Sequence, residues 1–281
     1  MSSNRLGAAA VAALLALPGA AQAITWGEPD AGENPHVGTL LFVQNGVGFF
    51  SCTGTLIAPR VLLTAGHCVA GRDDQGQMQT NEVTYVRFED DAFAGFFDHA
   101  TLQEWFDNEW LAVETVIAHP EWQDFAQFPI TNDMGVVILA EPHDAGLLGE
   151  IPPAGFLETL KGADKRYFRV VGYGLQGTLP PTFQDDYEKY KGTVRLLELN
   201  SLLSGQGMSS AKFSNNPGVG GGTCFGDSGG PTFYKDTQMV VAVTSFGWAK
   251  GGHCIGNDFN FRTDIPSAQA FLEEVLETYG E

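Results

Sequence analysis

Hydrophobic residues along this chain come in short runs separated by glycine, proline, asparagine and aspartate. The runs are rich in valine, threonine and phenylalanine, which is typical of β-strands bounded by turns. The chain is therefore predicted to be all-β. The expected strands cover residues 37–43, 49–57, 61–64, 83–88, 111–118, 133–139, 167–174, 192–199, 239–247 and 260–263.

The last segment of the chain follows a different period. Apolar residues between Ser267 and Tyr279 recur at helical spacing, which predicts a terminal amphipathic helix. They are Ala268, Phe271, Leu272, Val275 and Leu276. Residues 141–166 carry several prolines and glycines, and they are interpreted as a linker between two halves.

The first 23 residues form a segment of their own. A short cationic start precedes an Ala/Leu run over residues 6–17, Pro18 ends that run, and Ala-Gln-Ala closes the segment at Ala23. This order is typical of a secretory signal peptide. A membrane anchor would need about 20 apolar residues. We expect a soluble mature chain that begins at Ile24, is secreted to the extracellular or periplasmic space, and keeps no membrane anchor.

Composition and charge narrow the class of protein. With 43% hydrophobic and 17% charged residues over 281 positions, the chain is globular and long enough for a sizeable core. Its formal net charge is −19, and loss of one arginine with the leader gives 14 − 34 = −20. Such a surface disfavours nucleic acid and anionic membranes as partners, and favours cationic substrates at long range.

Four cysteines, Cys52, Cys68, Cys224 and Cys254, are an even number in a chain expected to be secreted. Two disulfides are therefore predicted. Three pairings are open, of which the local one would join Cys52 to Cys68 and Cys224 to Cys254. A zinc site is disfavoured because the usual ligand spacings do not occur.

Residues 70–112 are acidic and aromatic, and we expect loops there around one or two strands. Acids such as Asp73, Asp74 and Glu89 offer the oxygen ligands that Ca²⁺ takes. No EF-hand pattern is present, however, so a solvated acidic loop is the favoured interpretation. Neither a metal nor a cofactor is expected.

Three residues at strand boundaries carry the candidate chemistry. Ser228 lies among the glycines of residues 226–230, where the backbone can turn sharply and point amides at a carbonyl oxygen. A serine hydroxyl needs a neighbouring base to act as a nucleophile, and His67 closely follows the strand at 61–64. Asp133 opens an apolar strand, where a carboxylate must be hydrogen-bonded.

The same glycine-rich stretch also fits G-x-S-x-G, the nucleophile elbow of α/β-hydrolase esterases. In that fold the acid and the histidine follow the serine. Only 53 residues follow Ser228, and His253 is the sole histidine among them. The chain order His67, Asp133, Ser228 therefore disfavours an esterase, which remains an unlikely alternative.

Three blocks of sequence resemble the chymotrypsin/trypsin-like serine protease family: Thr64 to Cys68, Asn132 to Val136, and Gly226 to Pro231. Softer matches are residues 24–27, 172–174 and 245–247. Together they cover nearly all of residues 24–281. On these residues the chain is identified as a secreted bacterial-type member of the family.

The resemblance implies two six-stranded antiparallel β-barrels followed by the C-terminal α-helix, with the active site between the barrels. The domain limits that we expect are 1–23 for the signal peptide, 24–140 for the first barrel, 141–166 for the linker, 167–263 for the second barrel and 264–281 for the helix. By the same resemblance, the chain would be a serine endopeptidase that acts on protein or peptide substrates through an acyl-enzyme, and we expect a monomer.

The resemblance also implies roles for single residues. His67 would act as the base, Asp133 would orient it and Ser228 would attack, while the amides of Gly226 and Ser228 form an oxyanion hole. Ser245 would support Asp133. The segment Ser245, Phe246 and Gly247 would pair with an extended substrate.

Two further expectations concern activation and specificity. In the family a new N-terminal amine pairs with the acid before the catalytic serine, so signal cleavage would let Ile24 pair with Asp227 and activate the enzyme. The pocket base would fall on Gly222, followed by Thr223, and the missing acid favours an uncharged residue before the cleaved bond. Two residues could modify the pocket, Phe259 by narrowing its wall and His253 at its rim. A catalytically inactive relative used for binding is the other alternative.

Overall fold

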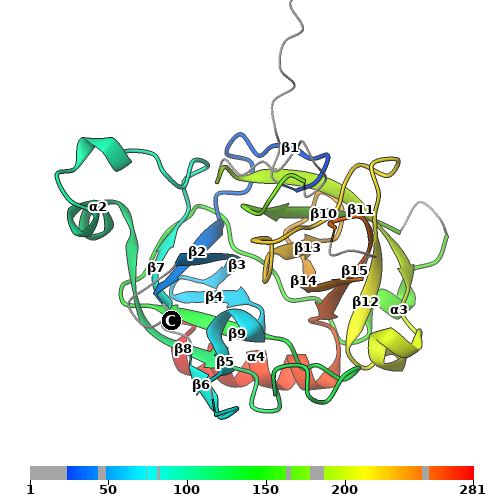
Figure 1. Ribbon diagram of the computed structural model, residues 1–281. Coiled ribbons are helices and arrows are strands. Elements are labelled where there is room, and N and C mark those ends of the chain that lie inside the picture. The colour runs from blue at the N-terminus through cyan, green and yellow to red at the C-terminus, as the bar shows by residue number, and fades with distance from the viewer. Residues whose placement is uncertain are drawn as a thin grey trace, which may run out of the picture.

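Two closed β-barrels lie side by side in the computed structural model (Figure 1). It describes residues 24–43, 49–73, 75–80, 83–162, 166–177, 187–248 and 253–281. The barrels and the terminal helix confirm the predicted fold class. The expected signal peptide lies outside the described residues, and the exact domain limits stay predictions. No helix in the described part of the chain is long and apolar enough to cross a membrane.

Six antiparallel strands close the first barrel. In order around it they are β2 (Val37–Val43), β3 (Phe49–Ala58), β4 (Val61–Thr64), β9 (Gly135–Leu139), β8 (Leu111–Ala118) and β7 (Val83–Arg87). Successive residues of a strand point to opposite faces. Val137 of β9 accordingly packs inside this barrel, whereas Val136 and Ile138 pack on its outer side. Both faces of β9 are covered, which is why its sequence is uniformly apolar.

The second barrel is closed by six further strands, because β11 pairs with both β10 and β12. They are β10 (Tyr167–Gly172), β11 (Tyr190–Glu198), β12 (Ser210–Asn215), β15 (Gly256–Arg262), β14 (Val240–Trp248) and β13 (Pro231–Phe233). The two-residue strand β1 (Glu28–Pro29) adds to the edge at β11.

One hydrophobic core joins the two barrels to the C-terminal helix α4 (Pro266–Tyr279). Phe271 and Leu272 of this helix pack in the same cluster as Val136 of the first barrel and Phe233 of the second. Figure 1 shows α4 running beneath both barrels. Each such side chain contributes about 1.5–3 kcal/mol when fully buried. The helix therefore fixes the barrels against each other and fixes the seam between them.

The remaining elements are short. They are α1 (Gly66–Val69), the hairpin of β5 (Ala70–Arg72) and β6 (Met78–Thr80), the 3₁₀ segment η1 (Phe96–Asp98), α2 (Leu102–Glu109), α3 (Phe156–Thr159) and η3 (Leu202–Gly207). The helix α2 and the strands β5, β6, β12 and β13 were not among the predicted elements. The terminal helix begins at Pro266, one residue before its predicted start.

Candidate active site

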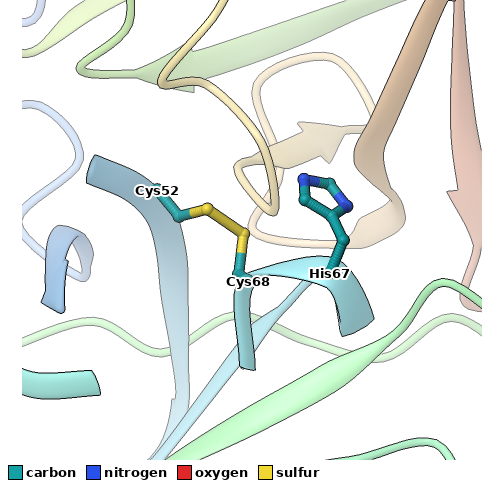
Figure 2. A group of neighbouring side chains, drawn as sticks. All are labelled: Cys52, His67 and Cys68. Carbon is teal, nitrogen blue, oxygen red and sulfur yellow. A yellow bond between two sulfur atoms is a disulfide. The ribbon is translucent and has the colours of Figure 1, made fainter. Parts of the chain in front are cut away.

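His67 stands on α1, the single helical turn that follows β4. The disulfide between Cys52 and Cys68 ties this turn to β3, and Figure 2 shows the imidazole rising beside it. The two sulfur atoms lie near the imidazole but are bonded to each other, so they are not thiolate ligands for a metal. Of the three pairings open from sequence, the structure has the local one, with the second bond joining Cys224 to Cys254.

Asp133 lies two residues before β9 and has no exposed surface. Its carboxylate accepts hydrogen bonds from the backbone amide of His67 at 2.9 Å and from the Ser245 hydroxyl at 2.5 Å. The ring atom Nδ1 of His67 lies 2.9 Å from its Oδ2. The structure thus brings together three residues predicted from separate parts of the sequence, and it satisfies the buried carboxylate.

The charge balance of this pair follows from burial and contact. Burial alone would raise the pKa of Asp133, but the charge and hydrogen bonds of His67 and the hydrogen bond from Ser245 outweigh it, so the pKa is lowered. Burial alone would lower the pKa of His67, yet the charge of Asp133 and its hydrogen bond raise the pKa above its ordinary value. A carboxylate at Nδ1 makes that nitrogen the donor and leaves Nε2 as the acceptor.

Ser228 lies in the loop between β12 and β13, pressed against the first barrel. Its carbonyl oxygen accepts a hydrogen bond from the Thr53 amide at 2.8 Å and lies 3.6 Å from the Cys68 sulfur. Gly229 follows with a φ of +78°, and a Cβ there would lie 2.0 Å from the Thr64 hydroxyl. Only glycine allows this approach. The contacts place the serine backbone next to the turn that carries His67.

The loop before Ser228 leaves two amides available. Gly226 has a φ of +100°, and its carbonyl accepts a hydrogen bond from the Thr53 hydroxyl at 3.0 Å. Among the described residues, the amides of Gly226 and Ser228 donate no hydrogen bond. The buried carboxylate of Asp227 holds the loop by accepting from the amides of Gly174 and Cys224, both at 2.8 Å. A carbonyl oxygen could therefore be received by the two free amides.

The Trypsin family model matches residues 24–272. The chain belongs to the trypsin family. Two relatives are Ovochymase-2 of Mus musculus, 26% identical over 239 residues, and CLIP domain-containing serine protease B15 of Anopheles gambiae, 26% identical over 235 residues. The matches cover 80% and 78% of this chain, but only 35% and 60% of those proteins. Both are animal proteins, so they give no support to the bacterial-type expectation.

A solved structure titled HL collagenase shares the fold, with a TM-score of 0.61 and 17% identity. The match covers 92% of this chain and 99% of that one. At this identity the likeness speaks for the fold alone. It agrees with the two-barrel fold.

An acid that the sequence interpretation missed contacts Thr223 of the predicted pocket base. Asp258 of β15 accepts from the amide and hydroxyl of Thr223 at 2.9 and 2.8 Å and from the Asn215 side chain at 3.0 Å. Burial raises the pKa of Asp258 to about 6, although these hydrogen bonds act to lower it. The only signal in the sequence was Asp258 itself, which lies two residues before the strand predicted at 260–263.

The structure also shows the surroundings of Phe259 and His253, the two residues expected to modify the pocket. Phe259 is buried and stacks on Phe246, with ring centroids 4.9 Å apart. The Phe259 ring is therefore covered by the ring of Phe246. His253 is half-buried and directly precedes the disulfide-bonded Cys254.

The segment from Ser245 to Gly247 presents a free strand edge. Strand β13 pairs only with residues 240–243 of β14, so among the described strands none covers residues 245–248 on that side. An extended peptide could add there through its backbone.

Phe125 adds an aromatic wall that the sequence interpretation did not include. Its ring lies 6.2 Å from the His67 ring and 5.8 Å from the Phe246 ring. Phe128, on the same loop, lies 5.7 Å from Phe246. Phenylalanines in a polar loop were the only sequence signal.

Ile24, the predicted first residue of the mature chain, is fully buried in the core of the second barrel. Its neighbour Thr25 exchanges backbone hydrogen bonds with Gly222 of the predicted pocket base, at 3.0 and 3.2 Å. The start of the family domain is thereby fixed against the loop that carries Gly222.

Proposed function

We propose that this trypsin-family chain is a serine endopeptidase, with Ser228 as nucleophile, His67 as base and Asp133 as the residue that orients the base. The supporting observation is the carboxylate of Asp133, buried and held between His67 and Ser245. It fixes the imidazole so that Nε2 can take a proton.

The reaction follows the template known for this family. The Ser228 oxygen attacks the substrate carbonyl carbon while His67 Nε2 takes the hydroxyl proton. The negative charge on the carbonyl oxygen is received by the amides of Gly226 and Ser228. His67 then gives its proton to the leaving amine, which leaves an acyl group on Ser228. Water, deprotonated by His67, then attacks the acyl carbon. The bond from that carbon to the Ser228 oxygen breaks, His67 returns the proton to this oxygen, and the acid leaves.

A labelling experiment tests the nucleophile. A fluorophosphonate probe should label the mature protein, and Ser228→Ala should abolish both labelling and peptide cleavage. Ser267→Ala, a change at the start of α4, should leave both intact. Labelling that survives Ser228→Ala would place the nucleophile elsewhere, and a protein that is never labelled would be a binding protein.

For the residue before the cleaved bond, we infer an uncharged side chain. Gly222 contributes no charge at the pocket base, and the oxygens of Asp258 are already occupied by three donors of this chain. A substrate cation would have to compete with those hydrogen bonds. Profiling with a peptide library should show cleavage mainly after apolar residues. Dominant cleavage after Lys or Arg would show that Asp258 acts as a charged pocket base.

Activation by export is part of the same proposal. Removal of residues 1–23 would free the amine of Ile24 to pair with Asp227. The disulfides agree with a secreted enzyme, which we expect to be a monomer. N-terminal sequencing of the secreted protein should begin at Ile24. A matched form with one alanine before Ile24 should lose most activity. Full activity of that form, or a different start, would contradict this route.

A further inference from the structure

A strip of aromatic rings crosses the segment between β7 and β8. We call residues 88–110 the acidic lobe. Phe97, Phe96 and Phe93 follow one another with ring centroids 5.0 and 5.9 Å apart, and Phe93 contacts Tyr187 at 4.9 Å. Phe97 is 93% exposed, the highest value among the large apolar side chains described. Figure 1 shows α2 of this lobe at the edge of the molecule, outside both barrels.

The lobe has a small core of its own that holds the strip in place. Trp105 and Trp110 are buried over the guanidinium of Arg87, which lies 5.6 and 5.9 Å from their ring centroids. Arg87 and the Trp105 indole both donate to the carbonyl of Ala94, at 2.9 and 3.2 Å. The exposed rings therefore stand on a packed base.

The strip is surrounded by negative charge. Residues 88–110 contain seven acids and neither lysine nor arginine. The acids are Glu89, Asp90, Asp91, Asp98, Glu104, Asp107 and Glu109. Apart from the partly buried Asp90, all of these acids are exposed. Exposed rings flanked by carboxylates match lysine and arginine, because the apolar stem of these side chains can cover a ring while the cation lies over its face or near an acid.

Other occupants fit less well. A second copy of the chain would bring an equally acidic lobe, and like charges repel. Several carboxylates are already used within the lobe: Asp91 accepts from the Phe93 amide and Glu104 from the Ala100 amide. The repulsion between two acidic lobes disfavours self-association. The carboxylates that already accept hydrogen bonds within the lobe disfavour a bound cation.

The geometry points to the acidic lobe as a docking site for a Lys/Arg-rich segment of the polypeptide substrate, held outside the cleft. This inference rests on the proposed protease function. A docked segment raises the effective concentration of the cleaved sequence at the active site.

Three substrates that share one cleaved sequence test the docking site. One carries a distal Lys/Arg-rich tail, one a Gly/Ser tail of equal length, and one no tail. The basic tail should raise kcat/KM for the mature enzyme through a lower KM. The gain should shrink between about 0.05 and about 0.5 M salt, because exposed charges are screened.

A double variant locates the effect. Phe97→Ala with Asp98→Asn removes one exposed ring and one exposed acid from the lobe. The gain from the basic tail should fall about fivefold, while kcat/KM for the untailed substrate stays unchanged. The matched control is Leu202→Ala with Glu273→Gln, an exposed apolar residue and an exposed acid on η3 and α4. The control should keep the full gain, which separates the lobe from the general negative charge of the protein.

Two outcomes would overturn the docking site: equal rates with basic and Gly/Ser tails, or equal losses in the lobe variant and its control. A dimer dispersed by the lobe variant would assign the strip to self-association instead. Binding of the basic tail peptide to Ser228→Ala, followed by fluorescence anisotropy, keeps the test independent of catalysis. Cleavage of the untailed substrate reports separately on the proposed function.

Discussion

Two buried carboxylates in this molecule, Asp133 and Asp258, accept similar numbers of hydrogen bonds, but their pKa values shift in opposite directions. Asp133 accepts from the His67 amide, the His67 ring and the Ser245 hydroxyl, and its pKa is lowered. Asp258 accepts from two groups of Thr223 and from Asn215, and its pKa is raised to about 6.

The opposite pKa shifts come from the charge of the hydrogen-bonding partner, which is an ionisable imidazole at Asp133 and only neutral groups at Asp258. Burial disfavours both carboxylate anions, and neutral donors offset that cost only in part at Asp258. His67 can become an imidazolium, and its charge turns the balance at Asp133. A buried acid beside an ionisable base thus stays charged more readily than a buried acid among neutral donors.

The largest expected effect is a difference in kcat between variants of Asp133 and variants of Asp258. Asp133→Asn removes the charge that fixes the tautomer of His67, and in the template for this family such a change lowers kcat by about 10⁴-fold. Asp258→Asn, measured with the same short uncharged substrate, should cost less than about tenfold, since no reacting group touches it. Equal losses in kcat would remove the distinction between the acids.

The next effect is on stability. The folded pKa of Asp258, about 6, lies above its unfolded value of 3.8, so the folded state holds a proton that the unfolded state releases. The contribution of Asp258 to the free energy of unfolding is fully present below about pH 4 and is lost as the pH rises through about 6. The total loss is about 3 kcal/mol.

Urea unfolding at a series of pH values, with the disulfides intact, measures this slope. The difference in unfolding free energy between the wild type and Asp258→Asn should change by that amount across the window. For Asp133, whose pKa is lowered, the contribution has the opposite sign and is lost as pH falls. Parallel curves for wild type and Asp258→Asn would contradict the raised pKa.

The sequence predicted those elements whose pattern reflects the core. Strands such as β9, with core on both sides, are apolar throughout. Strand β12 was missed because its buried positions include Ser214 and Asn215, whose polar groups bond within the protein. Helix α2 was missed among dense aromatics, although Thr101 caps it by accepting from the Glu104 amide. The Thr-x-x-Glu spacing was a usable signal.

The candidate site divides in the same way. His67, Asp133 and Ser228 lie in sequence motifs and could be predicted. Phe125 and Asp258 come to the site through tertiary packing, from segments with no motif. Spacing along the chain carries no information on such contacts, so the positions of Phe125 and Asp258 could not be predicted from sequence.

A smaller change sharpens the comparison at Asp133. Ser245→Ala removes a neutral donor but leaves His67 and its charge in place. A hydrogen bond to a charged group justifies an expected fall in kcat of about tenfold. Ser267→Ala is the control, with no change expected. If kcat is unchanged in Ser245→Ala, the hydroxyl does not help to hold the carboxylate.

The smallest expected effect is a shift in the titration of His67, observed by NMR of its imidazole in the inactive Ser228→Ala background. Asp133 raises the pKa of His67, so the imidazole should titrate above 6.5. Adding Asp133→Asn should lower that pKa, because the stabilising anion is gone while the burial remains. Adding Asp258→Asn instead should leave it unchanged, since the pocket acid hydrogen-bonds only to Thr223 and Asn215 among the described residues. A similar pKa shift in both variants would mean that both carboxylates influence the imidazole, and would contradict the assignment of this effect to Asp133 alone.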